Sequence, residues 1–260
     1  MLGEFDKLVH REFINQLTSM SNTSNFRKAI SDAQGQSLVG PNVIANALPF
    51  VGGGLILTAG GTFGGLNVLR THPELMSTFL VAMVAQIALF FFAQNVASKG
   101  NNAVALPLLT TYSLLSGYTL SGLVSVALQS AGVGIQGVGF AALACGITFI
   151  AARPIGSNLS EEDGMALSKT VQLGIMALVL VIVGQFVLSF FGVYAPNFLE
   201  IAISSIGVLL FVGAAVVDFF VLPRTYTDEQ ALPAALSMYL TYINLFVFIL
   251  RLLIAINGRD

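Results

Sequence analysis

Long apolar runs alternate with short polar segments along most of the chain. A membrane-crossing helix needs about 20 mostly apolar residues, and seven runs reach that length. They predict spans at Ala47–Leu69, Glu74–Val96, Ala103–Leu128, Gly132–Ala152, Ser168–Phe191, Asn197–Leu222 and Pro233–Ile256. The runs are continuous and not alternating, which favours helices over barrel strands. The pattern therefore predicts an all-α membrane protein with seven transmembrane helices.

The same pattern divides the chain into three parts. Residues 1–46 are expected to form a cytoplasmic segment, residues 47–256 the transmembrane domain and residues 257–260 a short external tail. Phe5, Leu8, Val9, Phe13 and Leu17 recur at helical spacing, which indicates an amphipathic helix on the membrane surface. A loosely ordered cap is the alternative. Residues 19–36 are rich in Ser, Asn, Thr and Gly and resemble a linker.

The amino-acid composition indicates that the fold is embedded in lipid. The chain is 55% hydrophobic and only 9% charged, whereas soluble domains carry about 25% charged residues. The expected partner is therefore the lipid bilayer. A net charge of −2, with no basic tract beyond Arg27 and Lys28, gives no support to nucleic-acid binding.

Lysine and arginine in the loops predict the direction of the helices. With an odd number of spans, one side collects eight basic residues: Lys7, Arg11, Arg27, Lys28, Lys99, Arg153, Lys169 and Arg224. The other side has three: Arg70, Arg251 and Arg259. This places the N-terminus in the cytoplasm and the C-terminus outside. No cleavable signal is evident ahead of the first span, so a bacterial inner membrane is expected, with an organelle membrane as the alternative.

The seventh span carries a polar stripe along one helical face. Its members recur at steps of four and three residues: Ser237, Thr241, Asn244, Phe248 and Arg251. A polar stripe facing lipid is costly, so this face should point into protein or water. The last helix is therefore expected to be central, with the other six wrapped around it.

The sixth span has a matching face. Its members are Glu200, Ser204, Gly207, Phe211, Ala214 and Asp218. Since the two spans are consecutive and antiparallel, Glu200 is expected to meet Arg251 at the outer end. Asp218 is expected to face Thr241 or Ser237 at the inner end. An ionisable residue at membrane depth is a functional lead.

The three charged residues on the facing sides of these two spans can also be explained without a functional role. Glu200 lies near a helix N-terminus, where an acid is favoured by the helix dipole. Arg251 is close enough to a polar end to extend its head group into water. Asp218 precedes Arg224 by six residues and can pair with it or reach interfacial water.

Small residues indicate where helices pack closely. Gly60/Gly64 and Gly61/Gly65 in the first span form two small-xxx-small pairs. In the third span the small residues recur every four positions: Ser113, Gly117, Ser121 and Ser125. We interpret these faces as helix–helix contacts. The single cysteine, Cys145, lies in an apolar run and is interpreted as a small packing residue.

Signatures of catalysis are missing from the sequence. Both histidines, His10 and His72, lie outside the predicted spans, and there is no HExxH motif for a zinc protease. There is no lysine deep in a span and no phosphate-binding glycine loop. We therefore expect a protein that is not an enzyme and that has no cofactor.

Two segments resemble the Bax-inhibitor (transmembrane Bax-inhibitor-motif) family. One is residues 235–246, ALSMYLTYINLF, followed by ILRLL at 249–253, which is similar to the last helix of that family. The other is residues 111–121, TYSLLSGYTLS, which resembles the family's third helix. The resemblance extends over about residues 47–256, and it implies a helical bundle wrapped around the last helix.

The resemblance also implies an activity, a pH-sensitive calcium leak. Its sensor in the family is a pair of carboxylates, one ending the sixth helix and one in the seventh, that share a proton. Asp218 matches the first position, but Thr241 occupies the second. One carboxylate facing a hydroxyl cannot share a proton in that way, and it offers less charge to calcium.

Two hypotheses of function follow. In the first, the chain is a pH-modulated calcium or cation leak gated by Asp218, Thr241, Asn244, Arg251 and Glu200, with Asp218 contacting the transported ion. In the second, it is a non-conducting accessory subunit that docks on a membrane protease or a larger membrane assembly. Bacterial relatives in the resembled family are linked to a membrane-bound protease, which supports the second hypothesis.

Overall fold

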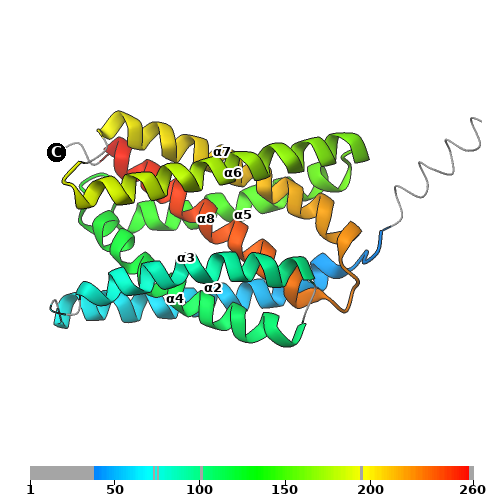
Figure 1. Cartoon of the computed structure of the whole chain (residues 1–260), viewed down its shortest axis with the longest axis horizontal. Coiled ribbons are helices and arrows are strands. Elements are labelled where there is room, and N and C mark those ends of the chain that lie inside the picture. The colour runs from blue at the N-terminus through cyan, green and yellow to red at the C-terminus, as the bar shows by residue number, and fades with distance from the viewer. Residues whose placement is uncertain (1–37, 73, 75, 100–101, 194–195, 258–260) are drawn as a thin grey trace, which may run out of the picture. The chain divides into compact units, whose positions relative to one another are not determined.

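The computed structural model describes residues 38–257 with gaps at 73, 75, 100–101 and 194–195. The predicted amphipathic segment, and all of the predicted tail except Asn257, therefore lie outside the described residues. Helices are labelled as in Figure 1, and they are α2 (Val43–Thr71), α3 (Met76–Lys99), α4 (Asn102–Gln129), α5 (Gly134–Ser157), α6 (Glu161–Phe190), α7 (Asn197–Thr225) and α8 (Ala231–Asn257).

Each predicted span corresponds to one of these helices. Six of them are long and apolar enough to cross a membrane, and α3 supplies the seventh. The part of the chain that the structure describes contains no strand. The all-α fold class with seven helices is confirmed.

The largest difference between a predicted span and its helix lies at the start of α6. The start of α6 is Glu161, whereas the span was expected from Ser168. The Ser160 hydroxyl accepts a hydrogen bond of 3.1 Å from the Asp163 N–H, and acids fill the first turn. A serine cap and negative charge both stabilise a helix N-terminus. These polar residues start the helix ahead of its apolar portion.

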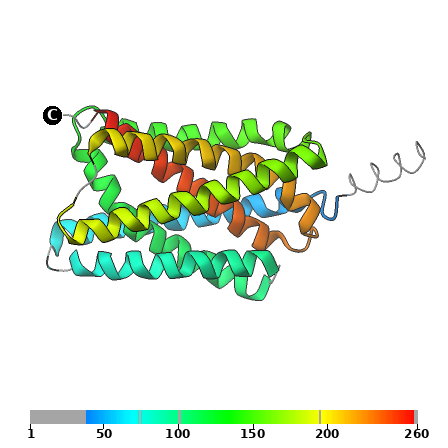
Figure 2. The same ribbon diagram turned by 45° about the horizontal axis from the view of Figure 1, so that its top comes forward.

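The helices form two groups with α8 between them (Figures 1 and 2). α2, α3 and α4 pack together on one side, and α5, α6 and α7 on the other. α8 contacts members of both groups, namely α2, α3, α4, α5 and α7, while α6 packs against α7. Leu236, Tyr239, Leu245 and Leu250 of α8 are fully buried. The last helix is therefore the centre of the bundle, as expected.

Close packing of α2 on α4 depends on glycine. A Cβ placed on Gly61 would overlap the backbone of α4, and one on Gly117 would overlap the backbone of α2. Gly65 lies equally close to Ser121. In contrast, a Cβ on Gly60 or Gly64 would meet nothing within 4 Å in the described structure. Of the two predicted small-residue pairs, Gly61/Gly65 therefore faces α4, whereas Gly60/Gly64 faces away from it.

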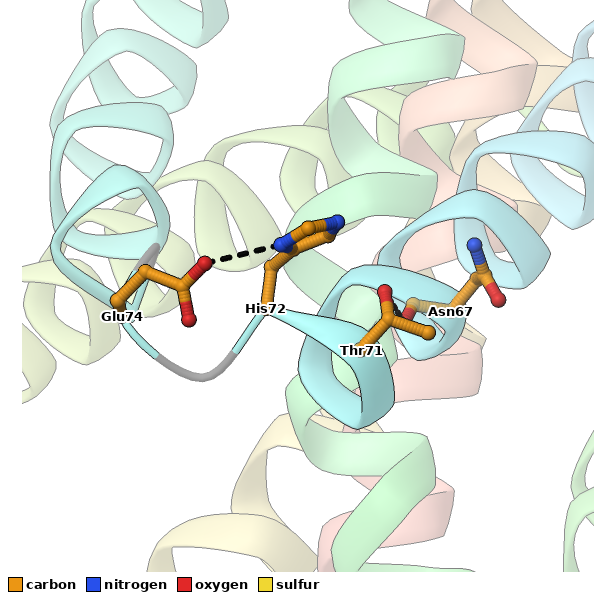
Figure 3. Close-up of polar contacts among 4 residues, drawn as sticks. All are labelled: Asn67, Thr71, His72 and Glu74. Carbon is orange, nitrogen blue, oxygen red and sulfur yellow. Dashed lines mark hydrogen bonds and ion pairs between the residues drawn. The ribbon is translucent and has the colours of Figure 1, made fainter.

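The two ends of the bundle are named here by their charges. At the Asp218 end, α7 finishes and α2 and α8 begin. At the Arg251 end, α7 begins, α8 finishes and α2 turns into α3. Figure 3 shows that turn, where the exposed His72 Nδ1 lies 2.9 Å from Glu74 Oε1.

Candidate functional site between the last two helices

The polar faces of α7 and α8 meet along one contact, which we call the charged seam. It consists of Glu200, Ser204, Gly207, Phe211, Ala214 and Asp218 from α7, with Ser237, Thr241, Asn244, Phe248 and Arg251 from α8. The helices are consecutive and antiparallel. The end of the α7 face therefore meets the start of the α8 face, and the start of the α7 face meets the end of the α8 face. Its two charged ends, Asp218 and Glu200, are 18 residues apart in α7, or about 27 Å at 1.5 Å per residue.

Asp218 is buried at one end of the charged seam. Asp218 is 7% exposed, and its Oδ1 accepts a 3.0 Å hydrogen bond from the Ser237 hydroxyl. The Thr241 hydroxyl also lies near this carboxylate. Oδ2 is buried and has no hydrogen-bond partner among the described residues. One oxygen of this buried carboxylate therefore receives no hydrogen bond from the described residues.

Arg224 does not neutralise Asp218 in this structure. Its Nη1 donates to the Phe220 carbonyl at 2.7 Å, and its guanidinium lies 4.1 Å from the centre of the Phe220 ring. A buried carboxylate without an ion pair is costly. Such groups are kept in membrane proteins mainly where they have a function.

The middle of the charged seam is apolar. Phe248 stacks on Phe211 with ring centres 5.5 Å apart, and a Cβ on Gly207 would overlap the Phe248 ring. Asn244 donates from Nδ2 to the Leu240 carbonyl of its own helix at 2.7 Å. It is therefore turned along α8, and the two aromatic rings separate the charged ends.

An ion pair closes the Arg251 end. Arg251 Nη2 donates to Glu200 Oε2 at 2.7 Å, and Gln185 Nε2 donates to the other oxygen, Oε1, at 3.1 Å. The side chains are 23% and 31% exposed. The contact predicted between Glu200 and Arg251 is present, and Gln185 adds α6 to it. These groups line a cavity of about 250 Å³ formed by Ile182, Gln185, Phe186, Ser189, Val193, Glu200 and Arg251.

A second polar region lies on the opposite side of α8 and was missed by the sequence reasoning. We call it the hydroxyl cluster, and it comprises Thr58, Gln86, Tyr112, Ser113, Ser116, Thr119 and Tyr239 from α2, α3, α4 and α8. Tyr239 is fully buried although it carries a hydroxyl. It follows Ser237 by two residues, which turns it about 200° around a helix. This rotation can be calculated from the sequence, and it indicates that Tyr239 faces away from the charged seam.

Neutral groups satisfy most of one another's hydrogen bonds within the hydroxyl cluster, although the buried Ser113 Oγ has no hydrogen-bond partner among the described residues. The Thr58 hydroxyl lies 2.9 Å from the Gly54 carbonyl and 2.6 Å from the Tyr239 hydroxyl. Since Thr58 donates its proton to a carbonyl, Tyr239 donates to Thr58. Gln86 donates to the Ser116 hydroxyl at 3.1 Å and accepts from Thr119. The cluster joins α2, α3, α4 and α8.

The donor set of the charged seam suits a transient cation. Calcium favours six to eight oxygen ligands, whereas Asp218 is accompanied by two hydroxyls, those of Ser237 and Thr241. No group of three His, Cys, Asp or Glu side chains gathers anywhere in the part of the chain that the structure describes. The described seam therefore supplies fewer oxygen ligands than a tightly bound calcium ion favours.

These features define a multi-pass helical membrane protein whose last helix carries a buried charged seam. The family model described as "Inhibitor of apoptosis-promoting Bax1" matches residues 40–259. The chain therefore belongs to the Bax-inhibitor family.

Bacterial proteins are similar over most of the chain. A protein of Streptococcus pyogenes serotype M1, named as an uncharacterized membrane protein, is 31% identical over 194 residues, covering 72% of this chain and 77% of its own length. A Deinococcus radiodurans protein is 31% identical over 225 residues, covering 84% and 90%. A protein of Helicobacter pylori strain 26695 is 27% identical over 213 residues, covering 81% and 85%. The likeness therefore extends over most of both chains.

Proposed function

We propose that this protein is a cation leak gated at the charged seam, with calcium as the ion to test first. The observation that carries the proposal is Asp218, which is 7% exposed and keeps Oδ2 without a hydrogen-bond partner among the described residues. That oxygen can bind either a proton or a cation, so the two compete for it. The expected result is a leak that changes with pH.

Gating follows from the division of the seam into three parts. Asp218 attracts the cation at one end, the Phe211–Phe248 stack blocks the middle, and the Glu200–Arg251 ion pair closes the other end. Conduction requires binding that is weak enough to release the ion. A site with one carboxylate and two hydroxyls meets that requirement.

The direct test is calcium entry into liposomes that contain the purified protein, at acid and at neutral pH. Native protein should conduct with a pH-dependent rate, and Asp218→Asn should lose the pH dependence together with most of the flux. Asp163→Asn is the matched control, because Asp163 is an exposed acid in the first turn of α6. Equal rates in protein-containing and empty liposomes would contradict the proposal.

A second variant separates this chain from relatives with two carboxylates. Thr241→Asp places an acid beside Asp218, where two carboxylates would share a proton. We expect a larger leak and a stronger pH response than in the native protein. If flux arises only in Thr241→Asp, the native chain is not a leak.

The bacterial inner membrane, with a cytoplasmic N-terminus, is part of the proposal. The basic residues Arg153, Lys169 and Arg224 lie toward the Asp218 end, which supports a cytoplasmic location for that end. A reporter fused after residue 260 that is active only outside the cytoplasm should be active. An inactive external reporter would reverse the orientation.

An accessory role in a larger membrane complex is the second candidate, and one observation favours it. Gly53, Gly60 and Gly64 share a face of α2 where a Cβ would meet nothing within 4 Å, so another helix can approach closely there. Gly60→Leu should then abolish co-purification of a stoichiometric membrane protease, whereas the outward-facing control Gly139→Leu should not. Unchanged recovery in Gly60→Leu would reject this face as the docking site.

A further inference from the structure

The cavity at the Arg251 end of the bundle forms where three helices meet, and we call it the Arg251 pocket. The end of α6, the start of α7 and the end of α8 lie together there (Figure 1). Its polar lining comes from Gln185, Ser189, Glu200 and Arg251, and the other lining residues are apolar. Pockets that enclose a whole drug-sized molecule usually have about 300–1,000 Å³. At about 250 Å³, the Arg251 pocket has room for a small polar group.

The ion pair in the Arg251 pocket leaves hydrogen-bonding capacity unused on both partners. A guanidinium has five N–H donors, and a carboxylate has about four acceptor sites. Among the described residues, Arg251 makes one hydrogen bond, to Glu200, and Glu200 accepts two, from Arg251 and Gln185. Both charged side chains line the pocket and are partly exposed. A positive and a negative group can therefore both contact a ligand here.

The two charges favour a ligand that carries both signs. Arg251 attracts an anion, but Glu200 is bonded to it at 2.7 Å and repels the same anion. A cation meets the reverse situation, whereas a zwitterion can place an opposite charge beside each group. A phosphate suits the guanidinium, and a primary ammonium can donate to Glu200 and to Ser189. The Ser189 hydroxyl donates its own proton to the Phe186 carbonyl at 2.6 Å, so its oxygen can accept.

The Arg251 pocket lies at the depth of the lipid headgroups. α7 has 29 residues and α8 has 27, which gives lengths of about 44 and 41 Å at 1.5 Å per residue. The hydrocarbon core of a bilayer is only about 30 Å thick, so the ends of both helices extend into the headgroup layer. Glu200 is three residues from the start of α7 and Arg251 is six from the end of α8, or about 5 and 9 Å. Both residues are therefore close to the boundary between headgroups and hydrocarbon.

Apolar side chains beside the Arg251 pocket are exposed on the surface of the bundle. Val193 lines the pocket and is 54% exposed. Phe191 and Phe198, which flank the connection between α6 and α7, are 77% and 70% exposed. In a bilayer, apolar surface of this kind is covered by acyl chains. A molecule with a polar head in the pocket can keep its chains on this surface, which favours a lipid over a soluble zwitterion.

We propose that the Arg251 pocket binds the headgroup of a phospholipid that carries a primary ammonium, of the phosphatidylethanolamine class. Arg251 binds the phosphate, Glu200 and Ser189 accept hydrogen bonds from the ammonium, and Gln185 holds Glu200 in position. A choline headgroup fits less well, because its fully methylated nitrogen has no N–H to donate. This binding does not depend on conduction, so it is expected whether or not the protein passes ions.

The first test compares lipids that have identical acyl chains and different headgroups. Native mass spectrometry of the purified full chain in detergent counts the lipids bound across a titration. We expect the ethanolamine lipid to bind about tenfold more tightly than the choline or the glycerol lipid, since one charge-assisted hydrogen bond is worth about that factor. Equal affinity for the three lipids would overturn the inference.

A change of one charge should reverse the headgroup preference. Glu200→Gln keeps an oxygen that can accept from Arg251 but removes the negative charge, so the pocket becomes cationic. We expect this variant to bind the glycerol lipid, which has a net negative charge, more tightly than the ethanolamine lipid. If Glu200 serves only the structure of the bundle, the native order of the three lipids remains, and that result would contradict the proposal.

Filling the Arg251 pocket should block the headgroup without removing either charge. Ser189→Leu places an apolar side chain among the lining residues, and the preference for the ethanolamine lipid should be lost. Ser157→Leu is the matched control. Ser157 also lies in the last turn of its helix and donates to the carbonyl three residues earlier, but at the Asp218 end. It should keep the native preference. An unchanged preference in Ser189→Leu would reject the pocket as the site, and Glu200→Gln decides the question should Ser189→Leu fail to fold.

A soluble competitor separates a lipid from a free zwitterion. Glycerophosphoethanolamine has the same headgroup without acyl chains. We expect it to displace the bound ethanolamine lipid only weakly, because the contacts of the chains with the apolar surface are missing. Displacement at equal concentration would assign the pocket to a soluble zwitterion and overturn the assignment to a lipid.

Discussion

The two sides of α8 solve the problem of buried polar groups in different ways. Toward α2 and α4, Tyr239 joins neutral hydroxyls and an amide that act as both donors and acceptors, and all but the buried Ser113 Oγ find a partner among the described residues. Toward α7, Asp218 only accepts when ionised, and one oxygen receives a bond from Ser237 while the other has no hydrogen-bond partner among the described residues. The hydroxyl cluster therefore joins four helices through neutral hydrogen bonds, whereas the charged seam contains a buried acid that is only partly hydrogen-bonded.

The difference extends to how closely the backbones approach. Gly61 of α2 and Gly117 of α4 each pack against the backbone of the facing helix. A larger side chain at either position would therefore push the two helices apart. The charged seam is held apart by side chains, with two stacked rings at its middle. Side chains can change rotamer while helices stay in place. The contact between α2 and α4 therefore depends on close backbone approach, whereas the contact between α7 and α8 depends mainly on side chains.

Adding a large side chain to the contact between α2 and α4 should cause the largest loss of stability. Gly61→Leu would drive a side chain into the α4 backbone, so we expect a loss of about 3 kcal/mol or more, with little folded protein recovered. Gly60→Leu is the control one position away, where a Cβ meets nothing within 4 Å. Thermal denaturation in detergent, followed by circular dichroism, measures both. Equal melting of the two variants would contradict the assigned packing face.

Breaking the ion pair of the charged seam should have the next largest effect. Arg251→Gln leaves Glu200 with Gln185 as its remaining donor. Because both charges are partly exposed, we expect a loss of about 1–2 kcal/mol, below the cost for a fully buried pair. The double variant Glu200→Gln/Arg251→Gln should recover part of that loss. A double variant that is less stable than Arg251→Gln would show that Glu200 does not depend on the arginine.

Removing one hydroxyl from the other side of α8 should cost less. Tyr239→Phe deletes the bond to Thr58 but keeps the ring in contact with Tyr112. The expected loss is about 1 kcal/mol, a typical net value for one hydrogen bond, with calcium flux unchanged. Ser237→Ala is the matched change on the charged side and should alter flux through Asp218. A leak equally sensitive to both variants would remove the distinction between the two sides.

Periodicity was enough to predict the charged seam because both partners lie on consecutive helices. Once the spacing of Ser237 and Thr241 defined a face, antiparallel packing brought Asp218 to it without knowledge of other helices. The same reasoning matched Glu200 with Arg251. Gln185 of α6, which donates to Glu200, was missed because the polar stripes identified in the sequence lie on the other two helices. Pairing across distant helices depends on rotation angles that one sequence does not contain.

The hydroxyl cluster shows this limit more strongly. Thr58 and Tyr239 are 181 positions apart yet lie 2.6 Å from each other. Gly60/Gly64 and Gly61/Gly65 have the same spacing, so the sequence offered no means of choosing the pair that faces α4. The choice depends on a helix rotation of about 100° per residue, which is set by the whole bundle.

The smallest effect is expected outside both sides of α8, at the turn between α2 and α3 (Figure 3). A hydrogen bond with its own backbone, and next the one with His72, lower the pKa of Glu74. A lowered carboxyl pKa contributes stability above the ordinary titration range of the group, and that contribution is lost as pH falls. Both side chains are largely exposed, at 59% and 66%, so water and salt screen the pair. His72→Ala should therefore melt with the native protein at both acid and neutral pH, while a clear shift in either condition would show that this turn, and not only the two sides of α8, holds the bundle together.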